Sequence, residues 1–245
     1  MRSTTRALAA TSLLALLTGT ALAADLSPPA PVYTAEANQS RFYVGSVSAA
    51  NFLERTTFRL NGAAVRSDYD VDSYFAGRIG YGLGRVYGVV LPRVEIEGGY
   101  ARNDVNRQTV NATRVAPIDS YGSTRSIQGY GNLFFDLDLG YAVRPFIGGG
   151  IGVADVRLRR QGTSATGVLV DSSDTGLSYH YGAGLGVDLG KLGFPLGATL
   201  FQGTVMELGY RRTETPDLRF QARDGTTSKT DYKADMVTLG ARKSF

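Results

Sequence analysis

Hydrophobic and polar residues alternate one by one along several long stretches of this chain. In the stretch VDSYFAGRIGYGL, Val71, Phe75 and Ile79 share one parity. Arg78 and Gly80 fall on the other parity. Successive side chains of a strand point to opposite faces, so this period of two predicts a strand with one apolar and one polar face.

Eight runs with β character follow one another from Arg41 onward, of which several alternate cleanly and the first is ambiguous in parity. None shows a helical period of comparable strength, so the sequence predicts an all-β fold. The eight runs are RFYVGSVSAANF, VDSYFAGRIGYGL, PRVEIEGGYAR, RSIQGYGNLFFDLDLG, RPFIGGGIGVADV, TGLSYHYGAGLGVDLG, TLFQGTVMELGYR and YKADMVTLGARKSF. Shorter connections, after runs two, four and six, alternate with longer hydrophilic ones. This alternation places all the long connections at one end, as four loops near residues 53–70, 102–125, 157–175 and 212–231.

The first 23 residues have the organisation of a secretory signal. Arg2 and Arg6 precede an apolar core, and a small-x-small end at Ala21 to Ala23 predicts cleavage after Ala23. The apolar run is too short for a retained membrane helix. Residues 24–40 contain three prolines and predict a flexible lead-in, which leaves residues 41–245 as the folded domain.

Composition narrows the possible functions. The chain of 245 residues has no cysteine, so disulfides and a lipidated amino-terminal cysteine are both excluded. Cleavage removes two arginines and lowers the formal charge from +4 to about +2, which is not the charge pattern of a nucleic-acid-binding protein. Most of the basic residues are arginine, which suits two-pronged contacts with phosphate and carboxylate.

Two fold classes differ in what the apolar face of the strands contacts. A soluble β-sandwich or lipocalin-like fold would also give strands with one apolar face. However, glycine crowds the polar face, at Gly80, Gly150 and Gly184 among others, and the strand number is even. With the export signal, these features favour an eight-stranded antiparallel up-and-down transmembrane β-barrel, with its apolar residues toward lipid and its amino terminus in the periplasm.

The same parity assigns residues to the membrane boundaries. Lys243 falls on the lipid-facing side, so we expect it at the periplasmic rim, where its ammonium group reaches the headgroups. Aromatic residues on this face are expected to include the girdles at the two membrane interfaces. They are Tyr81, Tyr100, Tyr179, Tyr181, Tyr210 and Phe245.

Several segments carry a resemblance to a known family. The sequence ADLSPPAPV after the alanine cleavage site, the opening FYVGS, the hairpin YAVRPFIGGGIGVA, the segment MELGYR and the terminal aromatic are the matching motifs. In these motifs the chain resembles the small eight-stranded outer-membrane barrels of alphaproteobacteria. These are the porin-family surface antigens, which are related to the opacity proteins and to the OmpA transmembrane domain. The resemblance implies location in the outer membrane. It also implies that Val237, Leu239 and Phe245 form the signal read by the outer-membrane assembly machinery.

Charged residues of both signs fall on the inward parity. An eight-stranded barrel has an interior filled by side chains, and buried charges must pair, so we expect a salt-bridged plug. A narrow or gated pore lined by the same residues is the alternative. The predicted network consists of Arg78, Glu95, Glu97, Asp136, Asp138, Asp188, Glu207, Arg211 and Arg242.

The sequence offers little catalytic chemistry. His180 is the single histidine, and Ser178 lies two positions away on the same face. The pair is the only candidate for a lipid A-modifying enzyme, and a lone imidazole is a poor haem or metal ligand. We therefore expect no enzyme, cofactor or metal.

The long connections carry arginines that face either solvent or lipopolysaccharide. Guanidinium groups there would bind the phosphates of lipopolysaccharide, with Arg159, Arg160, Arg212 and Arg219 as the candidate contacts. The expected function is structural and interactive, supporting envelope integrity and contacts with lipopolysaccharide or host. A small porin is the alternative, and a lipid A-modifying enzyme or haem-binding protein is a third class. The oligomeric state is left open.

Overall fold

The computed structural model describes residues 41–192 and 201–245, so the predicted signal peptide and lead-in lie outside the described residues. Its strands are β1 (Arg41–Leu53), β2 (Thr56–Leu60), β3 (Ala63–Tyr69), β4 (Asp72–Gly82), β5 (Val90–Val110), β6 (Thr113–Arg114), β7 (Ser120–Leu137), β8 (Val143–Thr163), β9 (Gly167–Asp188), β10 (Thr204–Gln221) and β11 (Thr227–Ser244). Two short 3-10 helices are η2 (Pro117–Asp119) and η3 (Leu189–Lys191). In these two ranges no helix is long and apolar enough to cross a membrane.

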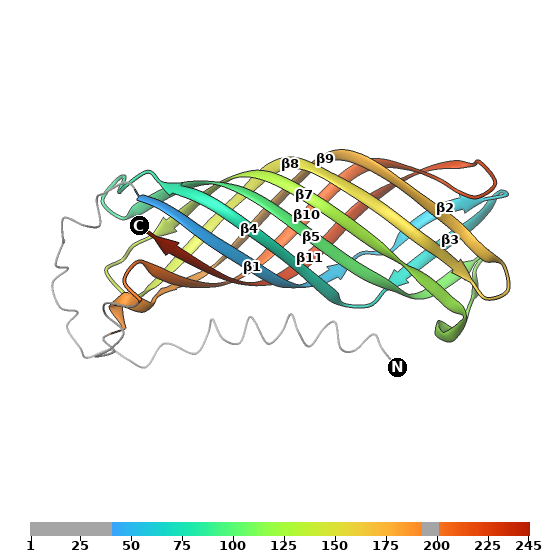
Figure 1. The fold of residues 1–245 in the computed structure, drawn as a ribbon, viewed down its shortest axis with the longest axis horizontal. Helices are drawn as coiled ribbons and strands as arrows, with labels where there is room; N and C mark the ends of the chain where they lie inside the picture. Colours follow the sequence, from blue (N-terminus) through green and yellow to red (C-terminus); the bar gives the residue numbers. More distant parts are fainter. Residues whose placement is uncertain (1–40, 193–200) are drawn as a thin grey trace. The chain divides into compact units, whose positions relative to one another are not determined.

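Eight strands form a closed antiparallel ring (Figure 1). The order is β1, β4, β5, β7, β8, β9, β10 and β11, with every neighbouring pair antiparallel. The ring closes because β11 pairs with β1, from Ser244 opposite Tyr43 to Ala234 opposite Leu53. This arrangement confirms the predicted eight-stranded antiparallel up-and-down barrel.

The outer face of the ring is apolar over about half of the length of its strands. On β7 the outward apolar positions run from Ile127, which is 64% exposed, to Leu137. The corresponding segment of β9 runs from Leu177 to Val187. A transmembrane strand needs about 9–11 residues, so this band, hereafter the apolar band, is long enough to cross a bilayer.

Aromatic residues mark both ends of the apolar band. Tyr100 and Tyr210 lie at the end toward the long hairpins, where the outward residues two positions further along are Arg102 and Arg212. At the other end, the ring of Tyr81 packs against that of Phe42 with centroids 4.7 Å apart. Such girdles are typical of membrane interfaces.

Lys243 lies at the end of the barrel that carries the chain terminus. It is opposite Val44 and Thr204 in the ring, and its Nζ donates to the Gln202 carbonyl oxygen at 2.6 Å. This is the rim position that its parity requires, and it confirms the assignment of the faces of β11.

The four predicted long loops are mostly strand, which corrects their assignment as loops. β5, β7, β8 and β9 have 18 to 22 residues, about twice the number that a bilayer requires. They continue as hairpins beyond the apolar band, and residues 53–70 contain the hairpin of β2 and β3. These segments appear hydrophilic in sequence because their outward positions turn polar where they leave the apolar band. We call this part of the barrel the extension.

The β2–β3 hairpin fills a gap in the wall of the extension. β3 pairs with β5, and β2 lies beside the hairpin of β10 and β11. The backbone N–H of Arg59 donates to Ser228 Oγ at 2.8 Å, and that of Asn61 donates to Asp224 Oδ2 at 2.6 Å. These bonds occupy donors on a strand edge that would otherwise be open to another chain.

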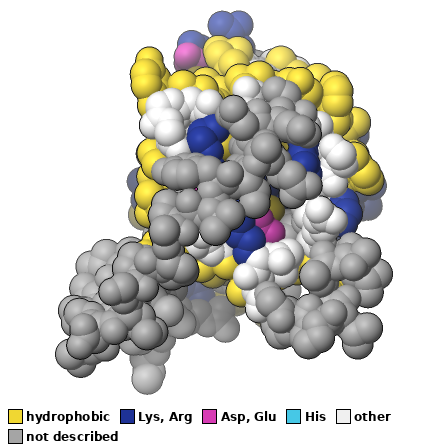
Figure 2. All heavy atoms as spheres, turned by 90° about the vertical axis from the view of Figure 1, so that its left-hand side faces the viewer, with side chains coloured by type: hydrophobic (Ala, Val, Ile, Leu, Met, Phe, Trp, Pro, Cys, Tyr) yellow, Lys and Arg dark blue, Asp and Glu magenta, His cyan; other side chains and the backbone are white. Residues whose placement is uncertain are grey.

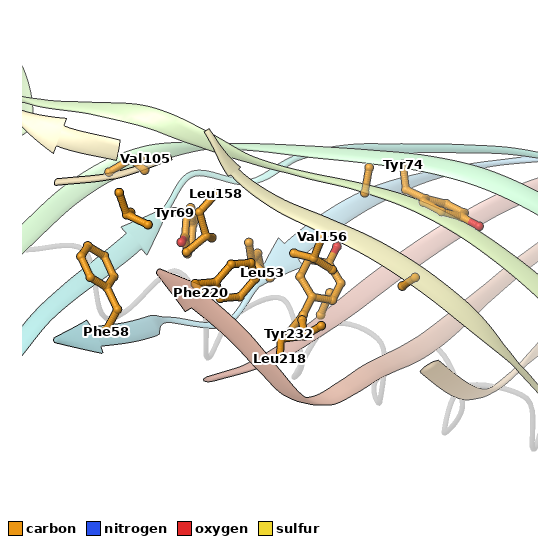
Figure 3. Close-up of a cluster of buried hydrophobic side chains, with 14 of the residues drawn as sticks. Leu53, Phe58, Tyr69, Tyr74, Val105, Val156, Leu158, Leu218, Phe220 and Tyr232 are labelled. Atoms are coloured by element: carbon orange, nitrogen blue, oxygen red, sulfur yellow. The ribbon is translucent and has the colours of Figure 1, made fainter. Parts of the chain in front are cut away.

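An apolar core fills the inside of the extension. Side chains from β1, β2, β3, β4, β5, β8, β9, β10 and β11 belong to this cluster, part of which Figure 3 shows. Phe58, Leu158, Leu218, Phe220 and Tyr232 are all at most 2% exposed. Their burial provides the hydrophobic driving force that keeps these long hairpins folded outside the membrane. The sequence analysis did not predict this core.

Candidate functional site

The interior of the membrane-spanning half contains charged side chains instead of an apolar core. Seven of the nine predicted network residues lie there, buried on inward positions of β4, β5, β7, β10 and β11. Alternation places them inside because the apolar residues of the same strands occupy the outer face. The seven are Arg78, Glu95, Glu97, Asp136, Glu207, Arg211 and Arg242.

Glu97 and Arg211 form a two-pronged pair next to the apolar core. Arg211 Nη1 and Nη2 donate to the two carboxylate oxygens of Glu97 at 2.6 and 2.9 Å. The hydroxyl of Tyr74 donates to the same carboxylate at 2.7 Å, and Asn132 Nδ2 approaches it at 3.5 Å. The charge on Glu97 is therefore met by four donor groups, which is the arrangement that a buried carboxylate needs.

His180 and Ser178 are bound to other partners in the interior. His180 Nε2 lies 2.8 Å from Asn132 Oδ1, and its ring packs edge-on against Tyr130. Ser178 Oγ lies 2.8 Å from the Tyr130 hydroxyl and 2.9 Å from Thr215 Oγ1. Among the described residues, no group of three or more His, Cys, Asp or Glu side chains is placed to hold a metal ion.

A larger cluster follows toward the short-turn end. Arg242 Nη2 donates to Asp136 at 2.5 Å, and Arg93 Nε donates to the other oxygen of Asp136 at 3.0 Å. Arg93 also binds Glu95, and Arg78 binds Glu207. Arg93 and Arg242 further approach Glu207 Oε1 at 3.3 and 3.4 Å, so the cluster is a continuous network across the barrel.

The charges of these two groups balance. Arginines 78, 93, 211 and 242 face four carboxylates, those of Glu95, Glu97, Asp136 and Glu207. Each side chain is buried, so separating one pair would leave an uncompensated charge in the interior. We call these eight side chains the plug. A neutral, mutually bonded plug has no spare charge with which to attract a permeating ion.

Asp138 and Asp188 lie apart from the plug, at the short-turn end. Asp138 accepts from Arg85 at 2.6 Å and lies 3.5 Å from Lys191 Nζ, while Arg144 donates to Asp188 at 2.8 Å. Figure 2 faces this end and shows basic and acidic side chains inside a hydrophobic margin. The nine predicted residues therefore belong to three groups, the Glu97–Arg211 pair, the larger cluster and this one, instead of one network.

The predicted network left out Arg93 and three neutral donors, Tyr43, Tyr74 and Asn132. Arg93 shares the parity of Glu95 and Glu97, so the alternation of β5 contains the signal that would have identified it. Tyr43, whose hydroxyl donates to Glu95 at 2.7 Å, lies in the first run, where the parity is ambiguous in sequence. Tyr43 also occupies the space where a Cβ on Gly80 would sit, which explains the glycine on that inward position.

The four candidate lipopolysaccharide arginines differ in their surroundings. Arg159, Arg160 and Arg219 are exposed on the extension. Arg212 instead donates to Glu54 at 2.8 Å, to Glu214 at 2.9 Å and to both oxygens of Asp235 at 3.1 Å. Three carboxylates thus bind its Nε and Nη1 groups, and Glu54 lies 158 positions away in sequence, beyond the reach of local pattern.

The three residues of the predicted assembly signal share the outer face of the last strand. Val237 and Leu239 are exposed in the apolar band, and Phe245 follows the end of β11 with 74% exposure. The backbone N–H of Phe245 donates to the Phe42 carbonyl oxygen at 3.0 Å, so the final residue stays attached to the first strand.

Comparisons with known proteins give one family match and several similar solved structures. Residues 11–245 match the family model described as outer membrane protein beta-barrel domain. A comparison with curated proteins gives no match. Similar solved structures include Neisserial surface protein A (17% identity, TM-score 0.43, covering 84% of this chain and 99% of that one). The attachment invasion locus protein Ail of Yersinia pestis (15%, 0.37, 85% and 99%) and the outer membrane protein AlkL (14%, 0.40, 90% and 97%) are also similar. Because the family match spans most of its length, the chain belongs to the outer membrane protein beta-barrel domain family.

Proposed function

We propose that this protein is a closed structural barrel of the outer membrane, and that its extension is the part that interacts with other molecules. The neutral, buried plug is the observation that carries this proposal. An eight-stranded barrel is only wide enough to be filled by side chains, and here the apolar core continues the filling through the extension. Such a barrel supports the envelope mechanically and exposes the outer surface of its hairpins.

We assign the extension to the cell exterior by analogy with other barrels. Bacterial outer-membrane barrels have short periplasmic turns and longer extracellular connections, so the end with the chain terminus lies in the periplasm. The extension then projects through the layer of lipopolysaccharide toward host or neighbouring cells. Exposed Arg159, Arg160 and Arg219 support contacts with phosphate groups there, whereas Arg212 does not because its charge is already paired with three carboxylates.

Solute uptake by liposomes distinguishes the closed barrel from a small porin. Vesicles containing the mature chain are transferred to an isotonic solution of a small sugar, and their swelling is compared with that of empty vesicles and of vesicles containing a general porin. We expect swelling at the rate of empty vesicles. Swelling that rises with the amount of protein would favour the porin and contradict the closed barrel.

We also propose that the barrel has no enzymatic activity. His180 and Ser178, the only candidates, use their polar atoms to bind Asn132, Tyr130 and Thr215 inside the barrel. Overproduction of the protein should therefore leave the acyl pattern of lipid A unchanged. An altered pattern that the substitution His180→Ala abolishes would show that this part of the proposal is wrong.

A further inference from the structure

Arginines gather where the apolar band ends on β5 and β7. The last apolar outward residues of these strands are Tyr100 and Ile127, which are opposite each other in register. Two positions further, Arg102 and Arg125 are again register partners. Because the band has the length of the bilayer core, these two arginines lie at the level of the outer headgroups.

A β-bulge adds two more arginines to the same area. The register of β8 shifts between Leu158 and Gln161, and Arg160 adopts a positive φ of 46°. Strict alternation would turn one of two consecutive side chains inward, but here both Arg159 and Arg160 are exposed. Glycine is required on the neighbouring strand, since a Cβ on Gly122 would lie 2.8 Å from the Arg160 carbonyl oxygen.

The four arginines surround one surface hollow. Its volume is about 450 Å³, and its lining includes Arg102, Arg125, Arg159, Arg160, Asp104 and Tyr121. It lies on the outside of the wall formed by β5, β7 and β8, and it is therefore separate from the plug. A hollow of this size has room for a phosphorylated sugar headgroup.

Most of the positive charge in the hollow has no partner among the residues that the structure describes. Arg102 binds Asp104 at 2.9 and 3.1 Å, which neutralises both groups. Arg125, Arg159 and Arg160 form no ion pair with any residue in the described part of the chain, and Arg125 Nε is buried without a hydrogen-bond partner. The opposite side of the barrel contrasts with this, because Arg212 there is surrounded by three carboxylates.

We propose that this hollow is a binding site for the phosphate groups of lipid A in the surrounding outer leaflet. The inference rests on the proposed contact with lipopolysaccharide and assigns that contact to one site. Three free guanidinium groups bind phosphate oxygens through paired, charge-assisted hydrogen bonds. The hollow opens toward lipid directly above exposed apolar residues, so a lipid can place its acyl chains on the band and its phosphates among the arginines.

Binding of lipid A to the folded mature chain tests this assignment. In micelles of a nonionic detergent, native mass spectrometry compares lipid A carrying both phosphates with the same lipid after dephosphorylation. The test variant combines Arg125→Gln, Arg159→Gln and Arg160→Gln. The matched control combines Arg59→Gln, Arg66→Gln and Arg114→Gln, three exposed arginines elsewhere on the extension.

We expect the wild-type chain and the control to prefer the phosphorylated lipid, and the test variant to bind it at least about tenfold more weakly. Equal loss in test and control variants, or no loss in the test variant, would overturn the site while leaving a general contact with lipopolysaccharide intact. No preference for the phosphorylated lipid in the wild-type chain would remove that contact as well. Inorganic pyrophosphate is the soluble comparison, and if it binds as tightly as the lipid, the assignment to lipid A is wrong. The single variant Arg159→Gln, at an exposed position, repeats the comparison if the triple variant does not fold.

Discussion

At the scale of the residue, the plug shows what an enclosed charge requires. Glu97 receives two guanidinium donors from Arg211 and a hydroxyl donor from Tyr74. Taking such a pair out of water is costly, and the attraction between the partners offsets the cost only when the geometry is good. The pair therefore contributes little net stability while both members are present. Removal of either member, however, leaves the other as an uncompensated buried charge.

Removing one member of this pair should destabilise the barrel. We expect Arg211→Met to lower the free energy of unfolding by about 3–5 kcal/mol, because it leaves Glu97 charged and unmatched in the interior. The double variant Glu97→Gln with Arg211→Met should recover much of this loss. The chain has no tryptophan, so urea unfolding in lipid vesicles is followed by far-ultraviolet circular dichroism. Exposed Arg66→Met is the control, and an Arg211→Met effect as small as that of the control would contradict the role of the pair.

At the scale of the element, the long hairpins form a second β structure on top of the membrane barrel. Asp224, in the turn between β10 and β11, joins this structure to the β2–β3 hairpin. The N–H groups of Asn61 and Thr226, and the Thr226 hydroxyl, donate to its carboxylate. These bonds, the first from Asn61, hold the pKa of Asp224 below its usual value.

The Asp224 contact should be present at neutral pH and lost only in strong acid. A carboxylate whose pKa is lowered by folding stabilises the folded form above the unfolded pKa of about 3.9, and this stabilisation disappears as pH falls through the folded pKa. We expect the amide resonance of Asn61 to stay constant between pH 5 and 8 and to shift with a midpoint below about 3.9. Asp224→Asn should remove the transition. A midpoint at or above 3.9 in the wild-type chain would contradict the assigned bonds.

The last strand should affect assembly more than stability. We propose that the assembly machinery reads Val237, Leu239 and Phe245, whose side chains are exposed on the outer face of β11. Deleting Phe245 should then reduce the amount of folded barrel in the outer membrane of cells several-fold. The same variant, refolded in detergent, should unfold at nearly the same urea concentration as the wild-type chain. Normal assembly in cells would contradict this role.

At the scale of the whole molecule, the sequence predicted the ring because alternation is a local property. Most runs between Arg41 and Phe245 carry their own apolar face, so the strand number and most of the faces follow without knowledge of contacts, whereas the parity of the first run is ambiguous. The apolar core of the extension was missed because its residues, such as Phe58 and Leu158, are dispersed among polar outward residues that resemble a loop. The inward position of Arg93 was accessible from the parity of Glu95 and Glu97.

Contacts that depend on how neighbouring strands align could not be predicted from the sequence. Two of the three carboxylates around Arg212 come from the β1–β2 connection and from β11, and the grouping of Arg102 and Arg125 depends on how β5 and β7 align. The exposure of both Arg159 and Arg160 depends on a bulge that shifts the alternation by one position. Parity assigns a side chain to a face, whereas its partners depend on the neighbouring strands.

Ion conductance in a planar lipid bilayer is the most direct test of the central claim that the barrel is closed. The mature chain is inserted at neutral pH, and insertion is verified independently by protease protection of the membrane-spanning strands. The plug and the apolar core both fill the interior, so the account predicts no stable open steps above the background of the bilayer. Stable single-channel steps, with an ion selectivity that Arg78→Gln or Glu207→Gln changes, would contradict it.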